Sequence, residues 1–130
     1  MGFYVVGLDP SVELIKIARK NSPKSIRYIV GDQTNLPSIG KFHIIVSIMT
    51  FPFIENIKTL FQLMIQALHP NGILVFADFN NDWVKECLRI KVSFADFDSD
   101  ENPKKGRITF GDIRIPVFLR SFNTYDELRK

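Results

Sequence analysis

Four short, mostly apolar runs that contain many β-branched residues recur in the first 78 residues, and two segments with helical periodicity lie among them. The runs span residues 4–8, 26–30, 42–49 and 73–77. Strands that alternate with helices over short connections are typical of a parallel sheet covered by helices. Residues 42–49 are almost continuously apolar, as expected of a strand buried on both faces. The pattern predicts one α/β domain over residues 1–130 with a mostly parallel sheet.

The two helical segments have start and stop signals. Ser11 can cap a helix that has apolar residues on one face and ends near Pro23. A second apolar periodicity predicts a helix from about residue 54 to residue 68, and the sequence His-Pro-Asn-Gly at 69–72 is expected to break it. Residues 107–110 and 112–119 predict a C-terminal antiparallel strand pair, and Thr124 opens a further helix.

Three of the four predicted strands end in an aspartate: Asp9, Asp32 and Asp78. The third strand is followed by Thr50 and a Phe-Pro-Phe segment. Ligands of parallel α/β sheets bind beyond the carboxyl ends of the strands. This edge of the sheet is therefore the candidate site.

Charge and composition exclude several partners. The net charge is +3, with 7 basic and 6 acidic residues through Asp82 and 10 basic and 8 acidic residues after it, so no basic stripe for nucleic acid emerges. The longest apolar stretch, residues 42–54, falls short of a membrane span, and no secretory signal is recognised. A single cysteine, Cys87, cannot form an internal disulfide. We expect a cytoplasmic protein without nucleic-acid or membrane partners.

The motif search removes whole reaction classes. No two of the seven glycines have the spacing of a dinucleotide or Walker loop. His43 and His69 lack further ligands at metal-binding spacing, and no serine lies in a nucleophile elbow. No metal site and no acyl-transfer triad are expected.

Four ordered segments carry a family resemblance: residues 5–11, 31–37, 42–47 and 68–74. Together they resemble the Rossmann-like class I methyltransferases that use S-adenosyl-L-methionine, from the second strand of that family through the end of its fifth and, more loosely, to its C-terminal hairpin. The resemblance implies a Rossmann-like fold and S-adenosyl-L-methionine as cofactor. It implies methyl transfer to an unidentified acceptor, expected to be a small molecule.

The same resemblance implies roles for individual residues. Asp9, followed by Pro10, would accept hydrogen bonds from the two ribose hydroxyls, and Asp32 would accept one from the adenine amino group while Gln33 lies against the base. Each aspartate has a structural alternative, since Asp9 can initiate a turn before Pro10 and Asp32 can cap its own loop.

The remaining implied positions follow the third and fourth strands of this chain. Residues Ile48, Met49 and Thr50 would border the methionine part of the cofactor. Phe51, Phe53 and Asn80 would line the acceptor pocket, although aromatic residues there are equally expected in the core. We assign no catalytic side chain, because displacement at a sulfonium methyl group depends on positioning alone.

One departure from the family concerns its first strand and glycine-rich loop, which have no counterpart in this sequence. In the family that strand lies between the strands formed here by residues 4–8 and 42–49. We therefore expect a fold incomplete at the N-terminus, as in a fragment or a split gene product. The chain alone should be weakly active or inactive, and a homodimer or a complementing chain should supply strand pairing. Two other functions stay open: an interaction module without cofactor, and another nucleotide-binding domain.

Overall fold

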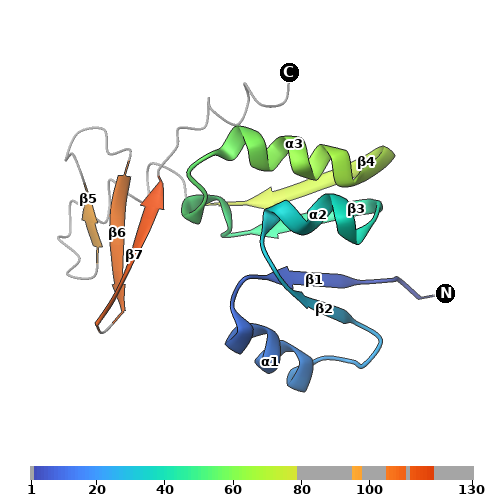
Figure 1. Cartoon of the computed structure of the whole chain (residues 1–130), viewed down its shortest axis with the longest axis horizontal. Coiled ribbons are helices and arrows are strands. Elements are labelled where there is room, and N and C mark those ends of the chain that lie inside the picture. Colours follow the sequence, from blue (N-terminus) through green and yellow to red (C-terminus); the bar gives the residue numbers. More distant parts are fainter. Residues whose placement is uncertain (1, 79–94, 98–104, 111, 119–130) are drawn as a thin grey trace.

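Two pairs of parallel strands form the centre of the molecule in the computed structural model, which describes residues 2–78, 95–97, 105–110 and 112–118. One pair joins β1 (Val6–Asp9) to β2 (Arg27–Val30). The other joins β3 (Phe42–Ile48) to β4 (Leu68–Ala77). Within the described residues no strand pairing connects the two pairs (Figure 1). The predicted parallel α/β fold is confirmed, with its sheet divided in two.

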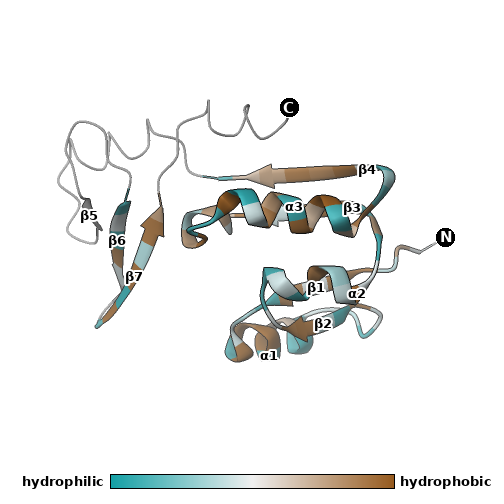
Figure 2. Ribbon diagram, turned by 45° about the horizontal axis from the view of Figure 1, so that its top comes forward, coloured by the Kyte–Doolittle hydropathy of each residue, from teal (hydrophilic) through white to brown (hydrophobic). Residues whose placement is uncertain are grey.

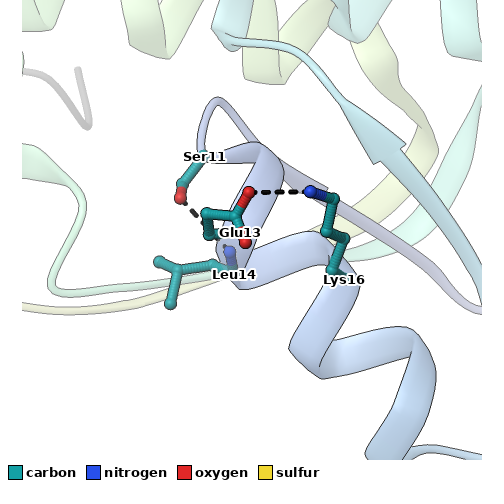
Figure 3. Close-up of polar contacts among 4 residues, drawn as sticks. All are labelled: Ser11, Glu13, Leu14 and Lys16. Atoms are coloured by element: carbon teal, nitrogen blue, oxygen red, sulfur yellow. Dashed lines mark hydrogen bonds and ion pairs between the residues drawn. The ribbon is translucent and has the colours of Figure 1, made fainter.

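Helix α1 (Val12–Asn21) connects β1 to β2 and begins as the sequence predicts. The hydroxyl oxygen of Ser11 accepts a hydrogen bond from the backbone N–H of Leu14 at 3.2 Å. Glu13 lies in the first turn and forms an ion pair with Lys16 at 2.8 Å (Figure 3). These contacts satisfy an otherwise unpaired amide and place negative charge at the positive end of the helix.

The second long helix starts later than predicted. A 3₁₀ turn η2 (Phe51–Phe53) comes first, and α3 (Ile57–Ala67) begins after Asn56, whose side-chain oxygen accepts from the N–H of Thr59 at 3.1 Å. The prediction placed the start near residue 54 because the apolar pattern runs on through the 3₁₀ turn. Between β2 and β3 lie two short elements, η1 (Gln33–Asn35) and α2 (Leu36–Ile39).

Helix α3 ends at Ala67, just before residues 69–72, as predicted, but these residues belong to β4 and not to a connection before it. A register irregularity opposite Phe42 and Ile44 accommodates them, and Asn71 adopts a left-handed backbone with φ 64°. Gly72 approaches the backbone closely, since a Cβ at that position would lie 2.9 Å from the carbonyl oxygen of His69. Proline and glycine in a strand are typical of such bulges.

The core lies between α3 and one face of the β3–β4 pair. Its buried residues are Phe51, Ile57, Leu60, Phe61 and Met64, and Leu36, Ile45, Ile54, Leu74 and Phe76 pack against them. Figure 2 shows polar and apolar residues alternating around α3, as expected of a helix with one buried face. Leu36 brings α2 into this core and so links the segment after β2 to α3.

The C-terminal part of the described chain is an antiparallel sheet of β5 (Ala95–Phe97), β6 (Lys105–Phe110) and β7 (Ile113–Phe118). The predicted pair is confirmed, and β5 is an addition to it. Lys105 forms an ion pair with Glu55 at 3.4 Å. The helix expected from Thr124 lies outside the described residues. None of the helices in the described ranges is long and apolar enough to span a membrane.

Ser47 of β3 is a buried polar residue. It is 6% exposed, and its hydroxyl oxygen has no hydrogen-bond partner within the described residues. A buried hydroxyl without a partner is destabilising, so Ser47→Ala should raise the free energy of unfolding by about 1 kcal/mol. Urea unfolding measures this. Ser38→Ala is the control, because the exposed Ser38 hydroxyl donates to the Asn35 carbonyl at 2.8 Å, and a gain there as well would contradict the explanation.

Candidate functional site

The candidate site is the edge where the parallel strands end. The arrowheads of β1 and β4 point to the same side in Figure 1, so their carboxyl ends share an edge. The N–H of Gly31 donates to the carbonyl of Asp9 at 3.1 Å, which places Asp32 directly beyond the end of β1. The N–H of Met49 donates to the carbonyl of Ala77 at 2.9 Å and joins the ends of β3 and β4 in the same way. The predicted residues therefore form two adjacent groups, one on each strand pair.

Asp9 is half-buried at the tip of β1 and takes part in a local turn. Its Oδ1 accepts a hydrogen bond from the backbone N–H of Ser11 at 2.7 Å. This is the turn-initiating role that the sequence left open. The other oxygen, Oδ2, accepts no hydrogen bond within the described residues, so the carboxylate is fixed through one oxygen.

Asp32 is held in a similar way on the exposed loop after β2. Its Oδ1 accepts from the backbone N–H of Thr34 at 2.8 Å and from the Thr34 hydroxyl at 2.5 Å. In return the side-chain oxygen of Asn35 accepts from the N–H of Asp32 at 3.0 Å, which completes a capping box. Gln33 is half-buried beside it. As for Asp9, Oδ2 accepts nothing within the described ranges.

Thr34 and Asn35 are positioning residues that the sequence analysis missed. The signal was present, because an aspartate two residues before a threonine and three before an asparagine is the spacing of a local cap. Gly31 belongs to the same arrangement, since a Cβ there would collide with the side chain of Asn35. Gly31, Thr34 and Asn35 therefore fix the conformation of the loop around the carboxylate of Asp32.

The hydrogen bonds from Thr34, first from its hydroxyl and then from its backbone N–H, hold the pKa of Asp32 below its ordinary value. A depressed pKa means that the folded-state contact stabilises while the carboxylate is charged and is lost as pH falls through the folded-state pKa. Thr34→Val should therefore raise the pKa of Asp32 toward its ordinary value. A carboxyl-carbon NMR titration measures the midpoint, and an unchanged midpoint in the variant would contradict the assignment.

The segment after β3 contains a strained backbone. Met49 has φ 55°, a left-handed conformation that non-glycine residues adopt at a cost on the order of 1 kcal/mol. Ile48 is 65% exposed, and the Thr50 hydroxyl, also at the surface, donates to the Ile48 carbonyl at 3.4 Å. Such outliers cluster at binding sites. Nothing in the sequence indicated this conformation.

The structure corrects one expected pocket residue. Phe51 is 1% exposed and packs in the core, with its ring centroid 5.3 Å from that of Phe61 and 5.1 Å from that of Phe76. It cannot line an acceptor pocket because its ring is enclosed on the α3 side. Phe53 is 45% exposed and stays a candidate for the acceptor pocket. Asn80 lies outside the described residues, and Asp78 is half-buried just after β4.

His43 and His69 lie at the opposite end of the β3–β4 pair, with ring centroids 4.5 Å apart. In the part of the chain that the structure describes, no group of three or more His, Cys, Asp or Glu residues could hold a metal ion.

Comparisons with known proteins point to one family. The sequence model of the family described as "Methyltransferase domain" matches residues 1–76. A malonyl-[acyl-carrier protein] O-methyltransferase 2 of Ilyobacter polytropus is 28% identical over 109 residues, which cover 82% of this chain and 41% of that protein. A malonyl-[acyl-carrier protein] O-methyltransferase of Xylella fastidiosa is 31% identical over 135 residues, covering 95% and 45% respectively. The chain thus spans less than half the length of these relatives.

Solved structures agree on the fold. An S-adenosylmethionine-dependent methyltransferase from Mesorhizobium loti superposes with a TM-score of 0.65 at 20% identity, over 96% of this chain and 60% of that chain. A candidate S-adenosylmethionine-dependent methyltransferase from Listeria monocytogenes gives a TM-score of 0.72 at 14% identity, over 98% and 64%. The family match covers more than half of the sequence, and the acid-tipped parallel strands fit it. The chain belongs to the methyltransferase domain family.

Proposed function

We propose that this chain supplies the adenosine-binding side of an S-adenosyl-L-methionine-dependent methyltransferase, which acts on a small-molecule acceptor. The observation that carries the proposal is the pair of aspartates at adjoining strand ends. Each uses Oδ1 for a local cap and leaves Oδ2 without a partner in the described residues. A carboxylate fixed in this way can accept a hydrogen bond without the entropy cost of ordering a loose side chain.

In this proposal Asp9 accepts from the vicinal ribose hydroxyls, with Pro10 beside it. A strand tip is a suitable place because the turn to Ser11 already fixes the carboxylate. Asp32 accepts from the exocyclic amine of adenine, which an acceptor-only group selects. The half-buried Gln33 lies against the base. The depressed pKa of Asp32 keeps this acceptor charged over the neutral range.

The β3 end provides the remaining contacts. In this proposal Ile48, Met49 and Thr50 border the methionine part of the cofactor, and the left-handed backbone of Met49 supports a binding role for this segment. Phe53 and Asn80 contribute to the acceptor pocket. Because the curated relatives are named for O-methylation of malonyl-[acyl-carrier protein], we propose an oxygen nucleophile as the acceptor group.

The chemistry is a direct displacement. When bound, the cofactor would supply a methyl group on a sulfonium. An ionised acceptor oxygen would form the bond to that carbon, and the electron pair of the broken carbon–sulfur bond would stay on sulfur, which would leave as a neutral thioether. The residues of this chain bind and orient the reactants, which can lower the barrier by several kcal/mol through positioning alone. We therefore assign no side chain as a general base.

The proposal is tested by Asp9→Asn and Asp32→Asn, measured by calorimetric titration with S-adenosylhomocysteine. Asparagine keeps the Oδ1 that caps each turn and removes the charge, so the fold should persist. Each lost charge-assisted hydrogen bond should weaken binding by roughly 1.5–3 kcal/mol, or about tenfold to 150-fold.

The matched control is Asp112→Asn, which changes an exposed acid beside β7 and should leave the affinity unchanged. If both site variants bind S-adenosylhomocysteine as tightly as the unmodified chain, the assignment of the two aspartates is wrong.

A non-catalytic interaction module is the second candidate. It is favoured by the division of the sheet into two pairs, which leaves strand edges open to another polypeptide. The titration separates the two functions, because a module that has lost the cofactor should not bind S-adenosylhomocysteine, whether or not another polypeptide pairs with its strand edges.

A further inference from the structure

The two histidines of the chain lie side by side where β3 and β4 begin. Phe42 of β3 pairs with Leu68 of β4, and the next residue on each strand is a histidine, His43 and His69. Neighbouring strands are about 4.8 Å apart, so side chains that follow a paired position lie next to each other. The imidazole ring centroids are 4.5 Å apart, with the ring planes tilted by 33°. Strand pairing therefore forms a histidine pair that the sequence spacing did not indicate.

The chain leaves the regular ladder directly after His69. Residues 70–72 have no paired partner on β3. Asn71 has the left-handed φ of 64°, and a Cβ on Gly72 would lie 2.9 Å from the carbonyl oxygen of His69 and 3.2 Å from that of His43. This irregular segment therefore packs closely against the backbone of both histidines and fixes the place of His69 on β4.

Both imidazoles are open to a ligand. His43 is exposed and His69 is half-buried. Neither ring forms a hydrogen bond or an ion pair within the described residues. Lys41, which precedes His43 by two residues, donates a hydrogen bond from its ammonium group to the carbonyl of Gln66, so its charge is held at the end of α3. The ring nitrogens of the pair are thus free to bind an external partner.

We propose that His43 and His69 together bind one divalent first-row metal ion of the kind that prefers imidazole, such as Zn²⁺ or Cu²⁺. A neutral imidazole has one nitrogen with a free lone pair, and imidazole is the commonest metal ligand in proteins. Metal–nitrogen bonds are about 2.0–2.1 Å long, so the two nitrogens of a chelate lie roughly 3–3.5 Å apart. Rings with centroids 4.5 Å apart reach this separation by rotation about their side-chain torsions, without movement of the strands.

A bound ion would join the starts of β3 and β4. This end of the strand pair is opposite the candidate site, so the ion has no part in the proposed methyl transfer. Chelation needs both histidines in place, and in the folded chain the pairing of the two strands provides this. A ligand that binds the folded chain in preference to the unfolded chain stabilises it, and the gain grows with ligand concentration. The proposal does not depend on cofactor binding.

The test is Cu²⁺ binding to the whole chain without a purification tag, at about pH 7.5, where imidazole is mostly neutral. Cu²⁺ is the probe because it has the highest affinity among these ions for a given site. All measurements use Cys87→Ser as the parent, because the single thiol also binds copper. Pulsed electron paramagnetic resonance should show two imidazoles on one ion. His43→Gln and His69→Gln should each leave one imidazole and weaken binding at least about tenfold, because the chelate is lost.

Urea unfolding with Zn²⁺ gives a second readout. Zn²⁺ should raise the midpoint of the parent and leave the midpoints of both histidine variants unchanged. His43 is exposed, so its variant should keep the metal-free midpoint of the parent. The matched control is Glu13→Gln, which removes an exposed carboxylate on α1 and should keep both the copper spectrum and the Zn²⁺ effect.

Three results would overturn the proposal. The first is a spectrum of the parent with only one imidazole on the ion. The second is a histidine variant that binds Cu²⁺ as tightly as the parent. The third is equal stabilisation of the parent and the histidine variants by Zn²⁺. Each of them would assign the metal to adventitious surface donors instead of the histidine pair.

Discussion

Replacing Phe51 with alanine should lower the free energy of unfolding by about 3–5 kcal/mol, as large-to-small changes of buried aromatic residues do. The Phe51 ring is 1% exposed and lies against the rings of Phe61 and Phe76. Alanine would leave a cavity at the point where η2, α3 and β4 meet. Because small domains are stable by only about 5–15 kcal/mol, the urea midpoint should fall sharply.

Phe53 is a close control, since it lies two residues away on the same 3₁₀ turn and is 45% exposed. Phe53→Ala should change the free energy of unfolding by less than about 1 kcal/mol. If the Phe51→Ala protein unfolds at the same urea concentration as the Phe53→Ala protein, the core position of Phe51 is contradicted, and Phe51 is again a candidate for the acceptor pocket.

The elements that could be predicted are those with local causes. β1 and β2 were recognisable because short apolar runs end at a proline or a glycine, and α1 because Ser11 precedes an amphipathic pattern. The positions of Asp9 and Asp32 at strand ends were predicted from the same apolar runs. Asp9 and Asp32 each cap their own loop, as their structural alternatives stated. Their Oδ2 atoms accept no hydrogen bond within the described residues, and the binding role stays a proposal.

The features that could not be predicted from the sequence depend on tertiary contacts. An aromatic residue after a strand can face the core or the solvent, and only the packing of α3 places Phe51 inside. Pro70 indicated a connection between the helix and the next strand. In the structure, pairing with β3 includes residues 69–72 in β4, with a register irregularity. The left-handed backbone of Met49 likewise depends on how β3 is packed. So does the buried Ser47 hydroxyl, which has no hydrogen-bond partner among the residues that the structure describes.

The division of the sheet links the fold to the proposed function. The resemblance implied a strand between residues 4–8 and 42–49, and in the structure β1 and β3 are indeed not paired. The aspartates proposed to bind adenosine follow the strands of one pair, and the residues proposed for the methionine part follow a strand of the other.

The 130-residue chain alone should bind S-adenosyl-L-methionine weakly, with a dissociation constant in the submillimolar range or above. The aspartates proposed for ribose and adenine are present, but the glycine spacing expected to supply backbone amides is absent from the sequence. Losing about two such contacts removes roughly 3–6 kcal/mol, on the order of a hundred- to ten-thousand-fold in affinity. Adenosine and the full cofactor should therefore bind with similar affinity.

Calorimetric titration of the purified chain with both ligands checks this. Tight binding by the chain alone, with a strong preference for S-adenosyl-L-methionine over adenosine, would mean that other residues of this chain already hold the methionine end.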